Sequence, residues 1–207
     1  MRLGVDFGGT KIEAALLDSN GEIRVRQRVP NPGNYDAAVR ILGTGCGGGV
    51  VVDGRTIEGA NAIGGEWGHT PLPWARADEV SVRDWCGRWN CLEQWVSGSG
   101  LRRWSGIGGR DLDAGVKAGD AHARVVLDQL ADRLARSLAV VMDILDPDAI
   151  VFGGGLSNID ALYPSVRGKL IAHVFSDVIR TNVVKNKHGD SSGVRGAAWL
   201  FTPEEAQ

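Results

Sequence analysis

The residues best suited to chemistry lie in glycine turns that carry an acid, a base or a hydroxyl. Asp6-Phe7-Gly8-Gly9-Thr10-Lys11 separates two apolar segments. Glycines allow backbone N–H groups to converge on a polyphosphate, and Thr10 and Lys11 add a hydroxyl and a positive charge. The carboxylate of Asp6 suits a hydrated magnesium ion. A plain glycine hairpin is the alternative interpretation of this turn.

Two further glycine turns favour phosphate binding. Leu42-Gly43-Thr44-Gly45-Cys46-Gly47-Gly48-Gly49 is followed by Val50–Val52 and a hairpin turn, Asp53-Gly54, so a strand comes next. A dinucleotide fingerprint needs a helix there, which excludes that site. The third turn, Gly153-Gly154-Gly155, follows an expected strand. The predicted phosphate-binding residues are Asp6, Gly8, Gly9, Thr10, Lys11, Gly43, Thr44, Gly45, Gly153, Gly154 and Gly155.

Carboxylates in two other motifs suit recognition of a neutral polyol. Glu66 lies in Gly65-Glu66-Trp67-Gly68-His69, and Glu93 ends Cys86-Gly87-Arg88-Trp89-Asn90-Cys91-Leu92-Glu93. A carboxylate accepts hydrogen bonds from sugar hydroxyls, and a site with such acceptors rejects analogues that lack the hydroxyl. The alternative for each glutamate alone is a solvated carboxylate in a loop.

The elements that position these residues alternate between strands and helices. Strands are predicted over 2–5, 11–17, 22–29, 50–52, 149–152 and 183–187, and helices over 121–145, 158–171 and 196–201. The helix over 121–145 is the clearest, because apolar residues from Val125 to Leu145 recur at spacings that keep one face apolar, and Pro147 ends it. Residues 59–75 are predicted to be a loop. The chain is therefore α/β, without a repeat period.

These motifs together resemble the ROK family of bacterial sugar kinases and related repressors. Leu145-Asp146-Pro147-Asp148 and Lys187-His188-Gly189-Asp190-Ser191-Ser192-Gly193 complete the resemblance, which covers almost the whole chain and is greatest for fructokinase (manno-fructokinase) members. It implies an actin-like, ribonuclease-H-like sugar-kinase ATPase fold that binds ATP and Mg²⁺. It also implies a hexose substrate such as fructose or mannose, bound by Glu66, His69 and Glu93.

The resemblance further implies a structural zinc ion. The family's ligands are a histidine and three cysteines, the first two spaced Cys-x-Cys, and here Asp84 takes the first cysteine's place. The implied ligands are His69, Asp84, Cys86 and Cys91, and a carboxylate is an acceptable zinc ligand. Asn90 replaces the glycine before the last cysteine, and asparagine tolerates the left-handed conformation. Two reduced structural cysteines are the alternative.

One part of the family pattern is missing. In ROK kinases, the segment between the third strand and the second glycine turn makes up most of the N-terminal lobe. It includes an Asn-Asp pair whose aspartate is the general base. This chain lacks that segment and passes directly from Arg40 to Ile41. No Asn-Asp dipeptide occurs in the sequence. We therefore predict an internal deletion and a truncated N-terminal lobe. Residues 1–40 would be its remnant, with a terminal helix at about 190–207 packing on it, and residues 41–189 the C-terminal lobe with a zinc-type loop over 69–93.

The family resemblance implies ATP-dependent phosphorylation of a hexose. We expect this chain to be inactive, because the segment that carries the catalytic aspartate is absent. The alternative is a non-catalytic remnant that binds zinc or nucleotide and pairs with another subunit. Repression needs a helix-turn-helix before the first strand, and the sequence starts at that strand, which disfavours it. Net charge is −2, and the scattered basic residues predict no nucleic-acid partner. Three cysteines and the lack of a long apolar segment predict a cytoplasmic protein without a membrane partner. A homodimer is one possible assembly.

Overall fold

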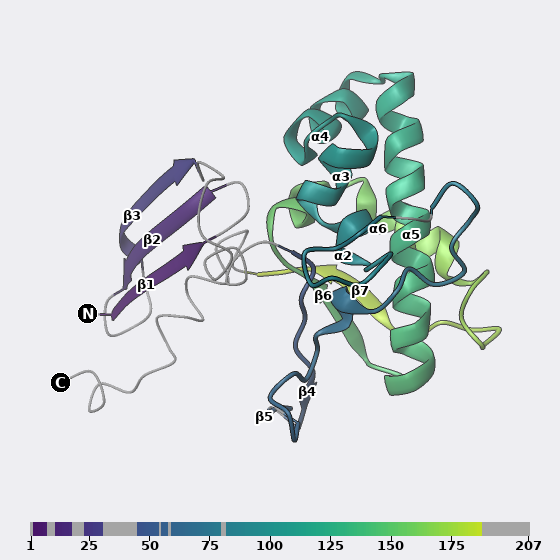
Figure 1. Cartoon of the computed structure of the whole chain (residues 1–207), viewed down its shortest axis with the longest axis horizontal. Helices are drawn as coiled ribbons and strands as arrows, with labels where there is room; N and C mark the ends of the chain where they lie inside the picture. The colour runs from purple at the N-terminus through teal and green to yellow at the C-terminus, as the bar shows by residue number, and fades with distance from the viewer. Residues whose placement is uncertain are drawn as a thin grey trace. The chain divides into compact units, whose positions relative to one another are not determined.

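A computed structural model describes most of the chain as α/β structure (Figure 1). The described residues are 2–7, 11–17, 23–30, 45–53, 55–57, 59–79 and 82–187, the first three ranges as strand backbone. The chain divides into two compact units. The first comprises Met1–Thr44, Val151–Asn158 and Lys185–Gln207, and the second comprises Gly45–Ile150 and Ile159–Val184. The predicted helix over 196–201 and the Arg40–Ile41 junction lie outside the described residues.

Three antiparallel strands form a sheet in the first unit. They are β1 (Arg2–Phe7), β2 (Lys11–Leu17) and β3 (Ile23–Pro30), with β2 in the middle. Arg2 pairs with Leu17, and Lys11 pairs with Pro30. The predicted bounds of β2 are confirmed, whereas β1 is two residues longer than expected. The hairpin predicted from the first glycine turn therefore exists.

A second hairpin follows the second glycine turn. Strands β4 (Val51–Val52) and β5 (Arg55–Thr56) pair antiparallel across a turn in which Asp53 has φ 49°. Aspartate is among the residues that tolerate this left-handed conformation in a tight hairpin. The strand after the glycines confirms that the loop lacks the helix that a dinucleotide site requires.

The second unit is built around α5 (Ala121–Leu145), whose predicted bounds are confirmed. The side chain of Asp120 accepts a hydrogen bond from the N–H of Ala123 (2.7 Å) and caps the helix. Its buried face includes Leu127, Leu130, Leu134 and Leu138, but Val125, which we placed on that face, is 55% exposed. Neither α5 nor any other helix in the described part of the chain combines the length and apolar character that crossing a membrane needs.

Three helices were not predicted. They are α2 (Glu93–Val96), α3 (Gly98–Ser105) and α4 (Gly109–Ala118), and Figure 1 shows α3 and α4 beside the N-terminal half of α5. The glycines of α3 and α4 lower helix propensity, and α2 has only four residues, so a periodicity argument misses all three. Gly100 is needed there, since a Cβ on it would lie 2.5 Å from the carbonyl oxygen of Gln94.

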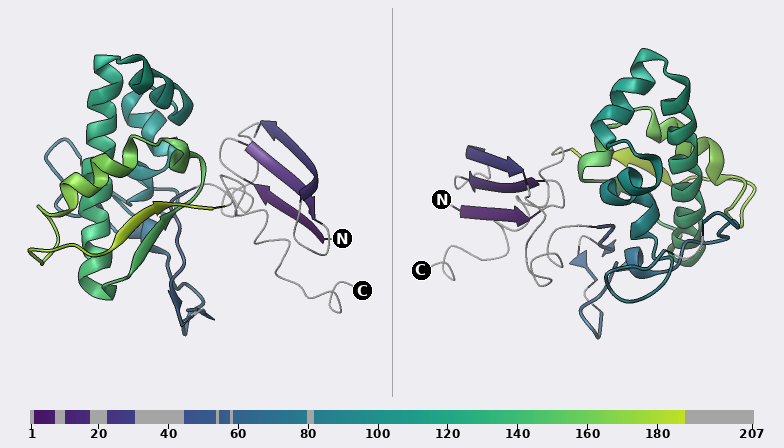
Figure 2. Two further views of the ribbon diagram at one scale, coloured as in Figure 1. Left: turned by 180° about the vertical axis from the view of Figure 1, so that it is seen from behind. Right: turned by 45° about the horizontal axis from the view of Figure 1, so that its top comes forward.

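The C-terminal part of the described chain supplies a short sheet and one more helix (Figure 2). Strand β6 (Ala149–Phe152) has its predicted bounds and pairs with β7 (Asn182–Lys185). The helix predicted over 158–171 is wrong at its start, because a 3₁₀ turn, η2 (Gly155–Asn158), precedes α6 (Leu162–Leu170). Pro164 cannot lie in a helix interior, so the helix begins just before it.

Candidate metal and sugar site

A tight turn in residues 82–91, here called the cysteine loop, positions two of the predicted ligands. The N–H of Gly87 donates to the carbonyl of Asp84 (3.0 Å), and the N–H of Asp84 donates to the carbonyl of Arg88 (2.9 Å). Gly87 has φ 85°, which glycine adopts without a Cβ penalty. The turn therefore brings the chain back alongside itself before Cys91.

The residue before the second cysteine closes this loop. Asn90 has φ 60°, so it adopts the left-handed conformation that we expected it to tolerate. Its side-chain amide donates to the carbonyl of Glu79 (2.5 Å), and its backbone N–H donates to the carbonyl of Val82 (2.7 Å). Cys91 then forms an isolated bridge with Pro71, which places it beside the segment that follows His69.

The four predicted metal ligands come together in the structure. One donor atom from each lies within 4.8 Å of all the others, and we call this group the ligand cluster: His69, Asp84, Cys86 and Cys91. The sulfur atoms of Cys86 and Cys91 are 3.6 Å apart, and Nδ1 of His69 lies 3.4 Å from Oδ1 of Asp84. Within the described part of the chain, this buried Nδ1 has no hydrogen-bond partner. One imidazole, one carboxylate and two thiols this close together fit a tetrahedral zinc ion.

The electrostatics of the ligand cluster also fit a cation. Burial raises the pKa of the Cys91 thiol to about 12, and Cys86 and Asp84 add to the effect. Burial also raises the pKa of Asp84, but hydrogen bonds from Cys86 and Gln94 outweigh it, and the net pKa is lowered. The carboxylate is therefore ionised, whereas the Cys91 thiol would have to lose its proton when a metal binds.

Glu93, predicted to bind sugar, is buried beside the ligand cluster at the first residue of α2. Its Oε1 accepts a hydrogen bond from the indole Nε1 of Trp85 (2.8 Å), and its Oε2 accepts one from the backbone N–H of Cys46 (3.2 Å). Burial raises the pKa of Glu93. A carboxylate offers about four lone-pair positions, so positions remain for a ligand hydroxyl.

The described part of the second glycine turn, Gly45–Gly49, packs closely on this site, and we call it the glycine loop. A Cβ on Gly45 would lie 1.8 Å from Oε2 of Glu93, and one on Gly68 would lie 1.6 Å from the carbonyl oxygen of Cys46. No side chain fits at either position. These glycines are therefore required for the approach of backbone to the predicted sugar residues.

Glu66 and His69 lie at the start and end of the turn that faces the glycine loop. Glu66 is exposed and precedes η1 (Trp67–His69), a short 3₁₀ helix inside the stretch that we predicted to be a loop. Burial, Glu93 and Glu66 together raise the pKa of the Cys46 thiol to about 12. Both carboxylates therefore lie within electrostatic reach of Cys46, and this thiol stays protonated.

The remaining predicted phosphate residues are only partly described. Asp6 is the second-to-last residue of β1 and Lys11 is the first residue of β2, and only the backbone of these two strands is described. Gly154 has φ 73°, and its carbonyl accepts a hydrogen bond from the hydroxyl of Ser157 (2.7 Å). Five predicted residues lie outside the described part of the chain: Gly8, Gly9, Thr10, Gly43 and Thr44.

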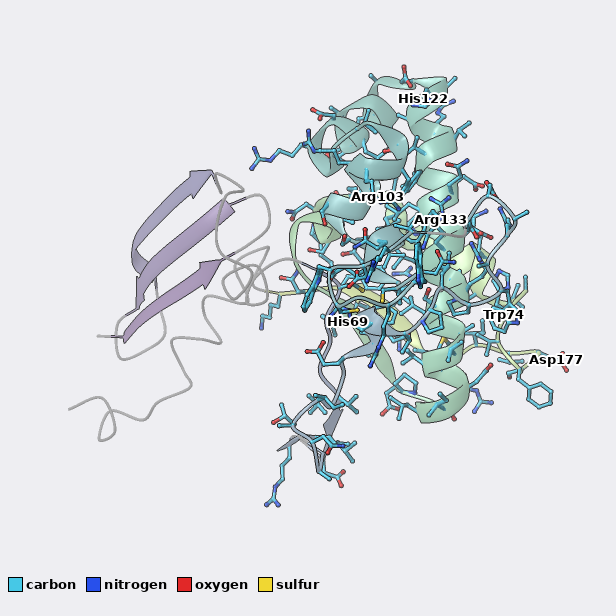
Figure 3. All side chains as sticks on the ribbon, in the orientation of Figure 1. His69, Trp74, Arg103, His122, Arg133 and Asp177 are labelled. Carbon is cyan, nitrogen blue, oxygen red and sulfur yellow. The ribbon has the colours of Figure 1, made fainter. Side chains whose placement is uncertain are left out.

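The other two histidines in the described part of the chain lie outside the ligand cluster, as Figure 3 shows for His122. We expected both His122 and His173 on helix surfaces. His122 is exposed at the start of α5, but His173 follows α6 and stacks on Trp74, with ring centroids 5.9 Å apart. Its Nε2 lies 3.9 Å from Oδ1 of Asp132.

Comparison with known proteins decides the family. The ROK family model matches residues 34–204. The chain belongs to the ROK family. Among curated ROK relatives, N-acetyl-D-glucosamine kinase of Pectobacterium carotovorum is 37% identical over 171 residues, and that of Photobacterium profundum is 39% identical over 171 residues. Each match covers 77% of this chain and 56% of the relative, so the chain spans little more than half of their length.

Solved ROK structures show the fold. A glucokinase of Streptomyces griseus, solved with glucose and AMPPNP, matches with a TM-score of 0.80 at 19% identity, covering 96% of this chain and 98% of that one. A hexokinase of Thermus thermophilus matches with a TM-score of 0.65 at 21% identity, covering 95% of this chain and 96% of that one. The predicted actin-like α/β fold is therefore confirmed, in a chain shorter than its relatives.

Sequence reasoning missed a buried charged group at Glu79, which lies just before the cysteine loop. It fastens this ROK chain's cysteine loop to α5, because the Glu79 carbonyl also accepts from Asn90 of the loop. Glu79, 2% exposed, accepts hydrogen bonds from Nε of Arg133 (2.8 Å) and Nη2 of Arg136 (2.8 Å). Arg136 also donates to the carbonyls of Pro73 (2.8 Å) and Trp74 (2.9 Å). Glu79 itself carries no motif, so its partners, 54 and 57 residues away, could not have been found by spacing.

Proposed function

We propose that this chain derives from an ATP-dependent hexose kinase, binds a hexose through Glu66, His69 and Glu93, and lacks useful turnover. The observation that supports this most directly is the packing of the glycine loop on Glu93, next to the ligand cluster. That arrangement joins a predicted phosphate loop, two predicted sugar residues and a metal site in one compact unit. The kinase names of the curated ROK relatives support the same function.

The substrate class is a hexose with several free hydroxyls. We expected fructose or mannose, and the relatives' names add N-acetyl-D-glucosamine as a third candidate. Exposed Glu66 can reach a ligand from solvent, whereas Glu93 is already fixed by two donors. We therefore assign to Glu66 a sugar hydroxyl that differs between hexoses, and to Glu93 a hydroxyl that the hexoses share.

The nucleotide would be ATP with Mg²⁺, held by the three glycine turns. Asp6 would hold the hydrated magnesium ion, and Thr10 and Lys11 would contact phosphate oxygens, as expected from their chemistry. The solved Streptomyces griseus relative contains AMPPNP, which supports an ATP-type ligand. The division into an N-terminal remnant over 1–40 and a C-terminal lobe over 41–189 belongs to the same proposal.

A zinc ion would be held by the ligand cluster and would supply structural cross-linking of the cysteine loop to His69. The donor set of one imidazole, one carboxylate and two thiols is sufficient for four-coordinate zinc. The chain's own residues do the rest: Gln94 orients Asp84 through a 2.8 Å hydrogen bond, and Trp85 packs edge-on against His69.

Replacing Cys91 by serine should release the metal. Cys91 is 1% exposed and supplies a sulfur that serine cannot match as a zinc ligand. Loss of a residue that merely supports a ligand typically costs 10–100-fold in metal affinity, so we expect a loss of at least about tenfold. The matched control is Cys46→Ser, since Cys46 is the remaining cysteine and lies outside the ligand cluster. Metal analysis and chelator competition measure both variants, and wild-type protein that binds no zinc would contradict the site.

Removing the exposed sugar carboxylate should weaken hexose binding. Hydrogen bonds to charged groups contribute about 1.5–3 kcal/mol, so Glu66→Ala is expected to lower affinity roughly 10–100-fold. Calorimetric titration with N-acetyl-D-glucosamine, mannose and fructose measures this. Asp113→Ala, which removes a half-buried carboxylate on α4 outside the proposed sugar site, is the control. Equal affinities in wild type and Glu66→Ala for every sugar would exclude the assigned role.

A further inference from the structure

Trp85 occupies a distinctive position, between two members of the ligand cluster in sequence and in contact with a third. It follows Asp84 and precedes Cys86 in the cysteine loop. Its ring meets the His69 ring edge-on, with centroids 5.0 Å apart and planes at 84°. Any displacement of the loop that opens the ligand cluster must therefore also move this indole.

The indole is in turn bonded to the carboxylate that holds the glycine loop. Nε1 of Trp85 donates to one oxygen of Glu93 (2.8 Å), and the other oxygen accepts the N–H of Cys46 (3.2 Å). The carboxylate is planar and buried, so its two oxygens move together. Gly45 packs on the same oxygen that binds Cys46, so this end of the glycine loop lies directly against the Glu93 carboxylate.

We propose that Trp85 and Glu93 form a strut that couples the metal site to the glycine loop, with Trp85 acting as a positioning residue. The inference rests on the proposed metal site and adds a consequence to it: occupancy of the ligand cluster sets the position of the Cys46 N–H, at the edge of a predicted phosphate loop. A bound cation fixes Asp84 and Cys86, which fixes the indole between them. The indole N–H then holds Glu93 in the orientation that accepts from Cys46.

The simpler interpretation is that Glu93 is a buried carboxylate with local partners and no link to the metal. The two interpretations differ in one measurable respect. In a strut, the effects of metal removal and of breaking the Trp85–Glu93 bond overlap, because both release the same carboxylate. In independent packing the two effects add.

Hydrogen exchange at the Cys46 amide, whose N–H donates to Glu93, tests the coupling. It is followed in wild type and Trp85→Phe, each loaded with zinc and each treated with chelator. Phenylalanine keeps an aromatic ring but is smaller than the indole and lacks its N–H donor. We expect chelation to speed exchange of this amide roughly tenfold in wild type, as fits loss of a hydrogen bond to a charged group. In zinc-loaded Trp85→Phe, exchange should already be fast, and chelation should add little.

Reciprocity provides a second readout. If the metal tightens the loop through Trp85, then Trp85→Phe must weaken zinc binding by the same factor. Trp89→Phe is the matched control, because Trp89 lies on the same cysteine loop and is similarly exposed (59% against 50% for Trp85), but in the described part of the chain its indole N–H has no hydrogen-bond acceptor. It should leave both loop exchange and zinc affinity unchanged. Should Trp85→Phe fail to fold, Glu93→Gln breaks the strut at Glu93, because glutamine has one carbonyl oxygen in place of the two that accept from Cys46 and Trp85.

The possible outcomes distinguish failure of the strut from failure of the metal site. Zinc binding without any change in loop exchange on chelation would overturn the strut and leave the metal site standing. Additive effects of chelation and Trp85→Phe would also overturn it. A chain that cannot be loaded with zinc would overturn both the metal site and the strut.

Discussion

In a coupled assay with ATP, magnesium and a hexose, the 207-residue chain is expected to turn over at least about 10²–10⁴-fold more slowly than an ordinary sugar kinase. That range is the typical contribution of a general base to proton transfer. The sequence contains no Asn-Asp pair to supply the base. Poor positioning of the sugar adds to the loss, because orientation of the reactants can contribute as much as the base itself.

Two carboxylates near the Arg40–Ile41 junction could be thought to replace the base. Asp53 lies in the exposed turn between β4 and β5, a hairpin of two-residue strands, and Asp36 lies outside the described residues. Full-length N-acetyl-D-glucosamine kinase of Pectobacterium carotovorum, assayed in parallel, is the positive control. Turnover of about 1 s⁻¹ or more by this chain, within the ordinary kinase range, would contradict the proposal. Asp53→Asn and Asp36→Asn would then identify the carboxylate responsible.

The sequence was most informative where a local pattern determines a local structure. The apolar repeat and Pro147 were enough to place α5, and the Asp53-Gly54 turn was enough to place the β4–β5 hairpin. The four residues of the ligand cluster were found through the family motif, and the structure brings them together. Whether they bind zinc stays a prediction.

The sequence was least informative where glycines or distant partners decide the structure. Helices α3 and α4 are short and rich in glycine, and each ends at a left-handed glycine, Gly106 with φ 78° or Gly119 with φ 81°. Those two glycines, together with Ser97, which caps α3, were the only local signals of these helices. The partners of Glu79 lie on a helix far along the chain, and no local pattern links them to it.

Glu79→Ala is expected to destabilise the chain by about 3–5 kcal/mol, the typical cost of removing one partner from a buried ion pair. The side chains of Arg133 and Arg136 are 7% and 3% exposed. Arg136 keeps an ion pair with Asp132 (3.1 Å), but within the described part of the chain Arg133 would stay buried without an anionic partner. The Cζ atom of Arg133 lies 4.1 Å from the Trp104 ring centroid, and this contact cannot replace an anion. Urea unfolding measures the change as a lower midpoint with an unchanged slope.

The matched control is Asp113→Ala, which removes a carboxylate from a pair at a similar distance on the surface. Asp113 and Lys117 are 2.6 Å apart, but the lysine side chain is 63% exposed. Exposed pairs four residues apart on a helix contribute only about 0.3–0.5 kcal/mol. A Glu79→Ala protein within about 1 kcal/mol of wild type would show that the buried group does not fasten the cysteine loop to α5.

Lowering the pH should remove the stabilisation that the ionised Glu79 carboxylate gives to wild type. Glu79→Gln lacks this carboxylate and has no such stabilisation to lose. Burial raises the pKa of Glu79, but hydrogen bonds from Arg133, the Arg76 backbone and Arg136 outweigh it, and the net pKa lies below its ordinary 4.5. Because the folded pKa is lower than the unfolded one, the stabilisation is complete above the unfolded pKa and is lost as pH falls through the folded one. The difference in unfolding free energy between wild type and Glu79→Gln should therefore be constant near neutral pH and shrink below about pH 4.5. Asp84 also has a lowered pKa, but it is present in both proteins and cancels in the difference. A difference that stays constant down to the acid transition would show that Glu79 does not bind Arg133 and Arg136 as an anion.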